Sequence, residues 1–204
     1  MHLHKLTTHN FSFEAGGTLD QLEIIFHTSE RPYQQGDRVV WLCHALTANS
    51  DPLDWWPEMV GDGCCVNPDN DFVVCVNIFG SAYGTTGPRS IENPLSFPKF
   101  TVRDTARLFT LVREHLGIEQ VDLLIGSSIG GFHALEWAIM EGNRIRHAAF
   151  IATAPRVSPW LSAWMEVQRM ALEADPTFRA CESLDGGRKG LEAARAISLI
   201  SYRS

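Results

Sequence analysis

The chain has 204 residues, of which 45% are hydrophobic and 20% are charged, and its net charge is −7. This length and composition fit one soluble globular domain or a large part of one, and the negative charge argues against nonspecific binding to nucleic acid or anionic membranes. No apolar run approaches the length of a membrane span, and residues 1–6 lack an apolar signal core. The five cysteines have no metal-binding spacing, which predicts reduced thiols in a cytoplasmic protein and no metal site.

Along the chain, strands and helices alternate. Residues 1–20 give few signals, although 11–13 are compatible with the start of an edge strand. Strands are predicted at 22–28, 38–43, 72–77, 121–126 and 148–153. Helices are predicted from Thr101, capped by Asp104, to Gly117, and at 132–140, 159–172 and 191–200. This order predicts an α/β fold with a largely parallel sheet, comprising a core at 1–157 and an incomplete helical lid segment at 158–204.

A strand, a tight turn and a helix meet at residues 126–130, Gly-Ser-Ser-Ile-Gly. This context is typical of a nucleophile elbow, in which a serine occupies a strained turn of positive φ above the sheet. Glycines on either side let the strand and the helix approach closely. Only Ser128 has glycine both two residues before and two residues after it, so Ser128 is the candidate nucleophile. The alternative is a plain Gly/Ser turn.

An activated serine needs an oxyanion hole, a base, and a group that orients the base. One oxyanion donor is expected to be the backbone N–H of Ile129, which also opens the following helix. The second is expected from the loop after strand 38–43, where the N–H of Leu46 is the candidate. His44 lies in the same loop. A structural role bonded to backbone is favoured for it over general base, because the expected chain order is Ser, Asp, His.

Five segments, taken together and in this order, resemble the homoserine O-acetyltransferase family. They are Cys-His-Ala-Leu-Thr at 43–47, Tyr-Gly-Thr-Thr-Gly-Pro at 83–88, Phe-Pro-Lys-Phe-Thr-Val-Arg-Asp at 97–104, the elbow and its helix at 126–138, and Ala-Arg-Ala-Ile-Ser-Leu-Ile-Ser-Tyr-Arg-Ser at 194–204. The resemblance covers residues 20–204. It implies an α/β-hydrolase fold with a largely parallel sheet and the start of a helical lid, with the C-terminal strands missing.

The resemblance also implies a reaction: acyl transfer from acetyl-CoA to the hydroxyl of L-homoserine through an acyl-serine intermediate, a step of methionine biosynthesis. Acetyl-CoA is then a co-substrate, and no bound cofactor is expected. Arg195 is implied as a contact of the substrate carboxylate, with a solvated lid arginine as the equally weighted alternative. The partners expected are small molecules, not nucleic acid or membrane, and the oligomeric state is left open, a homodimer included.

In that family the catalytic Asp and His follow the lid, whereas this chain stops inside the lid. Its eight histidines are at positions 2, 4, 9, 27, 44, 115, 133 and 147. None of them lies where a triad histidine belongs. The sequence therefore predicts a chain with a nucleophile and an oxyanion hole but no base, and hence no significant activity on its own.

Two other functions stay open at this point. The elbow alone also fits an α/β-hydrolase esterase, because fold does not determine function. A non-catalytic remnant is the third interpretation. The Gly-Thr-Thr-Gly-Pro loop and the lid segment favour the transferase. The sequence does not distinguish an acetyl from a succinyl donor, or homoserine from serine as the acceptor.

Overall fold

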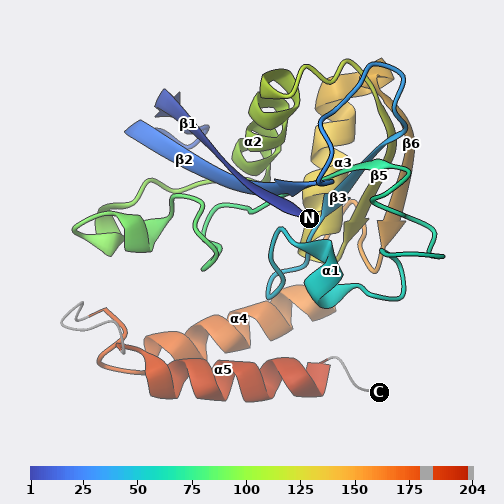
Figure 1. The fold of residues 1–204 in the computed structure, drawn as a ribbon. Helices are drawn as coiled ribbons and strands as arrows, with labels where there is room; N and C mark the ends of the chain where they lie inside the picture. Colours follow the sequence, from blue (N-terminus) through green and yellow to red (C-terminus); the bar gives the residue numbers. More distant parts are fainter. Residues whose placement is uncertain (180–185, 202–204) are drawn as a thin grey trace. The chain divides into compact units, whose positions relative to one another are not determined.

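The computed structural model describes residues 1–179 and 186–201 of the chain. The chain divides into two units, one of residues 1–90 and 97–155 and the other of residues 91–96 and 156–204 (Figure 1). The first unit contains a β-sheet with its helices. The described residues of the second form two α-helices and a short 3₁₀ helix, Pro94–Ser96. Cys181 and the Tyr-Arg-Ser end of the 194–204 motif lie outside the described residues.

The first unit is built on a six-stranded sheet in the order β1-β2-β4-β3-β5-β6. β1 pairs with β2, and β2 with β4, in antiparallel fashion, whereas β4, β3, β5 and β6 run parallel. The strands are β1 (His2–Ser12), β2 (Thr18–Thr28), β3 (Val39–Cys43), β4 (Phe72–Val76), β5 (Val121–Ser127) and β6 (Ile145–Ile151). The prediction of a largely parallel α/β sheet is confirmed. The carboxyl ends of its four parallel strands meet at one edge.

One part of the core lies between the central strands and two helices, and another lies between the strands and the segment that contains Val60 and Val66. Every residue of β3 and β4 is buried, as their continuous apolar sequences predicted. α2 (Val102–His115) and α3 (Ile129–Glu141) lie side by side, and α3 also packs on β5 (Figure 1). Trp41 of β3 and Trp137 of α3 are both fully buried, and their ring centroids are 4.5 Å apart. This contact joins the helix layer to the centre of the sheet.

The N-terminal hairpin was missed by the sequence prediction, which placed little structure before residue 22. β1 and β2 pair along ten positions and are joined by a turn in which Gly16 and Gly17 have φ of 94° and 92°. Most of β1 is exposed or half-buried. An edge strand with so little buried surface does not need the apolar alternation by which strands are recognised, so its sequence carries almost no signal.

The last strand is displaced from its predicted position, 148–153, and runs from Ile145 to Ile151. It ends early because Ala152 has a φ of 50°, a conformation that does not continue a strand. β6 is the edge strand, paired only with β5, and all of its residues are exposed or half-buried, including Phe150 and Ile151.

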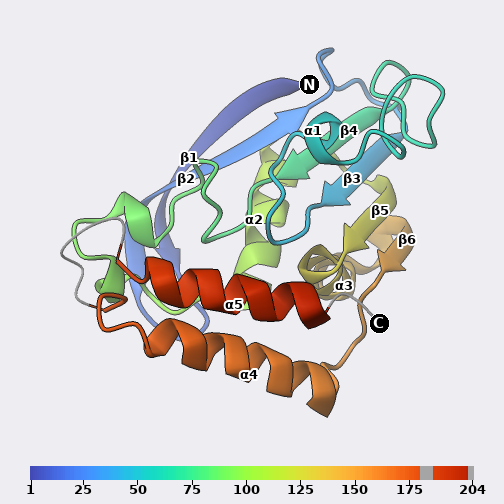
Figure 2. The same cartoon turned by 90° about the horizontal axis from the view of Figure 1, so that it is seen from below.

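The helices of both units start close to their predicted positions. The capping box of Thr101 and Asp104 at the start of α2 is confirmed. In the second unit, α4 (Pro159–Glu173) and α5 (Arg188–Ser201) form a helical hairpin (Figure 2). Gly190 permits their close contact, because a Cβ there would lie 2.8 Å from the carbonyl oxygen of Ala171. No helix of the described residues is long and apolar enough to cross a membrane.

We expect Asp104 to connect α2 to the N-terminal hairpin. Its buried carboxylate accepts hydrogen bonds from the N–H of Thr101 (2.9 Å) and the N–H of Glu14 (3.0 Å). Asp104→Ala should lower the free energy of unfolding by roughly 2–4 kcal/mol, because both donors lose their acceptor. Urea unfolding measures this. Glu114→Ala, at the exposed end of the same helix, is the control, with an expected change within about 0.5 kcal/mol. Equal effects of the two changes would contradict this role.

Candidate active site

Ser128 occupies the strained turn that the sequence predicted. It lies between β5 and α3 with φ 55° and ψ −122°, and it is exposed. Its N–H donates to the carbonyl oxygen of Ile151 (3.0 Å), and its carbonyl oxygen accepts from the N–H of Gly131 (3.0 Å). A non-glycine residue in this conformation costs free energy and persists only where its surroundings hold it. These two bonds tie the turn to β6 and to the start of α3.

Three glycines permit the close approach of strand and helix at this turn. A Cβ on Gly126 would lie 2.6 Å from Cβ of Ala134, and a Cβ on Gly130 would lie 2.6 Å from the carbonyl oxygen of His44. A Cβ on Gly131 would overlap the side chain of Thr153. The predicted reason for glycine two residues before and after Ser128 is therefore confirmed. Any side chain at these positions would push α3 off the sheet.

The loop after β3 lies directly against the elbow. A Cβ on Gly130 would also overlap the carbonyl oxygen of Cys43, so the backbone at 43–44 touches the first turn of α3. Leu46 follows two residues later and Ile129 is the first residue of α3. Among the described residues, neither N–H has a hydrogen-bond acceptor. Their role as oxyanion donors stays a prediction, and both belong to segments that meet at the serine.

His44 is a buried structural side chain that joins two loops. Its Nδ1 lies 2.8 Å from the carbonyl oxygen of Ala45, and its Nε2 lies 3.3 Å from the backbone N of Ile78. A carbonyl can only accept and an N–H can only donate, so we assign the proton to Nδ1 and the lone pair to Nε2. The lone pair is occupied by the N–H of Ile78. This geometry supports the structural interpretation of His44 over the general-base one.

A second buried histidine, His133, lies on the elbow helix. Its Nδ1 is buried and has no hydrogen-bond partner among the described residues. Burial, with a smaller contribution from the neighbouring His44, lowers the pKa of His133 to about 4. Burial also lowers the pKa of His44. Both rings are therefore neutral near pH 7.

Among residues 1–179 and 186–201, no group of three or more His, Cys, Asp or Glu is placed to hold a metal ion.

The irregular segment after β4, which contains the Gly-Thr-Thr-Gly-Pro motif, is held by a set of specific hydrogen bonds. The hydroxyl of Thr85 accepts from the N–H of Ile25 (3.0 Å) and donates to the carbonyl of Asn77 (2.9 Å). Thr86 exchanges bonds with the backbone of Glu23 through its own N–H and hydroxyl, both at 2.9 Å. The two threonines of the Gly-Thr-Thr-Gly-Pro motif thus fix this segment along β2.

Sequence reasoning missed the corner after β6. Ala152 has a positive φ, and Thr153 packs on Gly131 with a buried hydroxyl that has no partner among the described residues. Alanine and threonine have no preference for such a corner, so no local signal marks it.

The last candidate, Arg195, lies on α5 in the second unit with its side chain exposed. Its contact with a substrate carboxylate stays a prediction.

This sheet order, with a strained serine between β5 and α3, defines a class of protein. Residues 38–194 match the family model of the alpha/beta hydrolase fold, and the chain belongs to that family. Its predicted resemblance within the family is also confirmed. It is 40% identical over 203 residues to a homoserine O-acetyltransferase of Nostoc punctiforme and 38% identical over 199 residues to one of Cyclobacterium marinum.

These matches include 95% and 94% of this chain and 57% and 56% of the two relatives. The chain thus spans about half the length of the curated relatives it matches. A solved homoserine O-acetyltransferase from Staphylococcus aureus superposes with a TM-score of 0.81 at 28% identity. That superposition includes all of this chain and 59% of the other. The likeness therefore extends from sequence motifs to the fold.

Stability should fall as the pH drops from about 6.5 to about 4, because the unfolded chain then binds a proton at His133 that the folded chain excludes. The loss from this residue should reach about 3 kcal/mol. His133→Gln should flatten the pH dependence of the free energy of unfolding, measured with urea between pH 7 and pH 4. An unaltered slope in the His133 variant would exclude this explanation.

Proposed function

We propose that this fold, in a protein of the length its relatives have, transfers an acetyl group from acetyl-CoA to the hydroxyl of L-homoserine, a step of methionine biosynthesis. The observation that carries the proposal is the strained, exposed Ser128 at the meeting point of two segments with unpaired N–H groups. The similarity to curated homoserine O-acetyltransferases over nearly the whole chain supports this acceptor.

The reaction proceeds in two displacements at one nucleophile. Oγ of Ser128 attacks the thioester carbon, its proton passes to a base, the carbon–sulfur bond breaks, and CoA leaves as its thiol. The N–H groups of Leu46 and Ile129 donate to the oxyanion of each tetrahedral intermediate. The homoserine hydroxyl then gives its proton to the base and attacks the acyl-serine. The bond between the acyl carbon and Oγ breaks, Oγ of Ser128 takes the proton back, and O-acetylhomoserine leaves. Because CoA leaves before homoserine reacts, the kinetics are ping-pong. Arg195 binds the carboxylate of the acceptor in this scheme.

The 204-residue chain supplies no histidine suited to be the base. His44 and His133 are buried and their pKa values are lowered, and the Nε2 of His44 already accepts from Ile78. His147 lies on β6 with Nδ1 3.2 Å from the carbonyl oxygen of Asp122, and the others are on β1, β2 and α2. We therefore propose that the base and its orienting carboxylate come from polypeptide beyond these residues.

In a protein extended by the C-terminal part that its relatives have, acetyl-CoA should leave one acetyl group on Ser128. Peptide mass spectrometry after rapid quenching locates it. Ser128→Ala should lower kcat by roughly 10⁴-fold, because the groups around an activated serine act as a unit. Ser127→Ala is the matched control and should retain most of the activity. Label on Ser127, or wild-type turnover by the Ser128 variant, would refute the assignment.

The 204-residue chain alone should show no turnover with acetyl-CoA and L-homoserine, because Ser128 lacks a base within about 2.6–3.2 Å. Release of free thiol measures this. Slow release without O-acetylhomoserine is expected at most, since an oxyanion hole and binding alone retain some rate above water. Turnover near about 10 s⁻¹ would contradict the proposal. In the extended protein, rapid hydrolysis of acetyl esters without transfer to homoserine would favour the esterase instead.

A further inference from the structure

A pocket of about 310 Å³ lies in the segment that follows β4. It is lined by Gly80, Ser81, Ala82, Gly84, Thr85, Gly87, Pro88, Arg89 and Ser90. None of these residues is acidic, in a chain whose net charge is −7. The guanidinium of Arg89 is exposed and forms no ion pair with a described residue. The pocket therefore offers one uncompensated positive charge surrounded by small residues and hydroxyl groups.

Backbone N–H groups add to this positive character. Gly80 and Gly84 have φ of 75° and 103°, and the N–H groups of Gly80, Ala82 and Gly84 have no acceptor among the described residues. Backbone N–H groups without an acceptor in the protein are donors that an anionic ligand can use. Gly84 cannot carry a side chain here, because a Cβ would lie 2.9 Å from Cγ1 of Ile25. Gly84 thus lets this wall of the pocket lie directly against β2.

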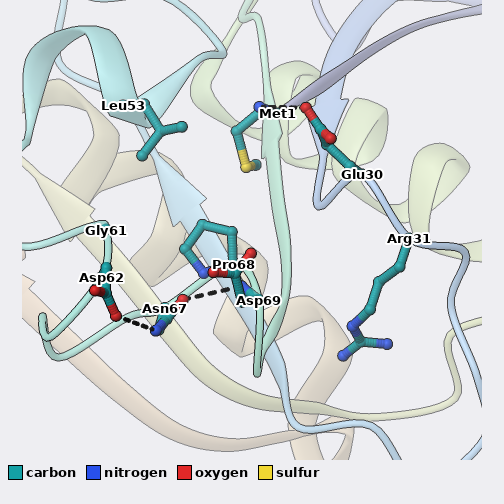
Figure 3. A pocket seen from close by; sticks show the side chains of 9 residues that line it. All are labelled: Met1, Glu30, Arg31, Leu53, Gly61, Asp62, Asn67, Pro68 and Asp69. Atoms are coloured by element: carbon teal, nitrogen blue, oxygen red, sulfur yellow. Dashed lines mark hydrogen bonds and ion pairs between the residues drawn. The ribbon is translucent and has the colours of Figure 1, made fainter.

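The other pockets of the same unit differ in this respect. The pocket in Figure 3, about 430 Å³, is lined by Glu30, Asp62 and Asp69 in addition to Arg31, whose guanidinium is paired with Asp37 at 2.7 Å. Two further pockets include Asp122 or Glu114. A fourth has no carboxylate, but its Arg107 is 3.3 Å from Asp104 and lies over the ring of Phe11. Among these five pockets of the described residues, only the pocket that contains Arg89 combines an unpaired arginine with a lining free of carboxylates.

The pocket is on the same edge of the sheet as the candidate nucleophile. It follows the carboxyl end of β4 and Ser128 follows the carboxyl end of β5, and both strands run parallel to β3. His44 links the two places, since its Nε2 accepts from Ile78 and its carbonyl oxygen packs on Gly130. The anchoring bonds of Thr85 and Thr86 hold the pocket in position before any ligand arrives. Preorganisation of this kind lowers the cost of binding.

We propose that this pocket binds phosphate groups of the acyl donor, with Arg89 and the N–H groups of Gly80 and Gly84 as donors. Guanidinium groups match the geometry of phosphate oxygens and bind them in bidentate fashion. The inference rests on the proposed function, because that function supplies a thioester whose thiol portion carries a phosphorylated nucleotide. The group that the pocket binds is a phosphate. Its proposed source is the nucleotide of the acyl donor, as a monoester or diester, and the alternative source is free inorganic phosphate.

The test is binding to the folded 204-residue chain, which does not require turnover. Adenosine 3′,5′-bisphosphate should bind, and its titration should shift the amide resonances of Gly80 and Gly84. Arg89→Gln should raise the dissociation constant about tenfold or more, because a charged hydrogen bond is lost. Arg89→Lys should restore part of the affinity. The affinity should fall as salt is raised, whereas pantetheine, which lacks phosphate, should be insensitive to Arg89.

Arg144→Gln is the matched control, since it removes the same charge from an exposed position far along the chain at the end of α3. It should leave the affinity unchanged. Equal effects of Arg89→Gln and Arg144→Gln, or shifts at residues 61–69 in place of Gly80 and Gly84, would refute the pocket. Binding of inorganic phosphate as tight as that of the bisphosphate would identify a simple anion site and refute the donor assignment.

The experiments distinguish failure of the phosphate site from failure of the proposed transferase function. Arg89-dependent binding of the bisphosphate without acetylation of Ser128 in the extended protein would leave the phosphate site and overturn the transferase. Acetylation of Ser128 without Arg89-dependent binding would leave the transferase and overturn the phosphate site.

Discussion

The site depends on the close packing of α3 against the carboxyl ends of β3 and β5. This packing is possible only because Gly126, Gly130 and Gly131 carry no Cβ. It forces the chain to reverse within one residue, and Ser128 takes the positive φ that such a reversal demands. It also brings the backbone at 43–44 against the first turn of α3. One steric constraint thereby exposes the serine and gathers two segments with free N–H groups around it.

The parallel strands place further loops next to this closely packed turn. Because β3, β4 and β5 run in the same direction, the loops that follow them converge on one edge of the sheet. His44 bonds the first two loops together, and the low dielectric around it and His133 keeps both rings neutral. Two neutral rings avoid the cost of buried charge in these segments. The bond from His44 also holds the segment at 78–90, from which the proposed phosphate site is built.

The edge of the sheet opposite the N-terminal hairpin is formed by β6. β6 pairs on one side only and exposes apolar side chains such as Phe150 and Ile151. The chain spans 56–57% of its curated relatives, and the proposed base belongs to the part that they have in addition. The proposals therefore separate cleanly. In these proposals, the nucleophile, the oxyanion donors and the phosphate site belong to these residues, and the base belongs to polypeptide beyond them.

The sequence alone determined the features that local pattern encodes. Apolar runs located β3, β4 and β5, Thr101 and Asp104 located the start of α2, and the glycines around Ser128 identified the elbow and its strain. Tertiary structure decided the rest. β1 forms because β2 offers it an edge, Ala152 is strained because β6 must turn away beside Gly131, and His44 becomes a structural residue because Ile78 reaches its Nε2. These properties depend on contacts between residues far apart in the chain, which no local window of sequence contains.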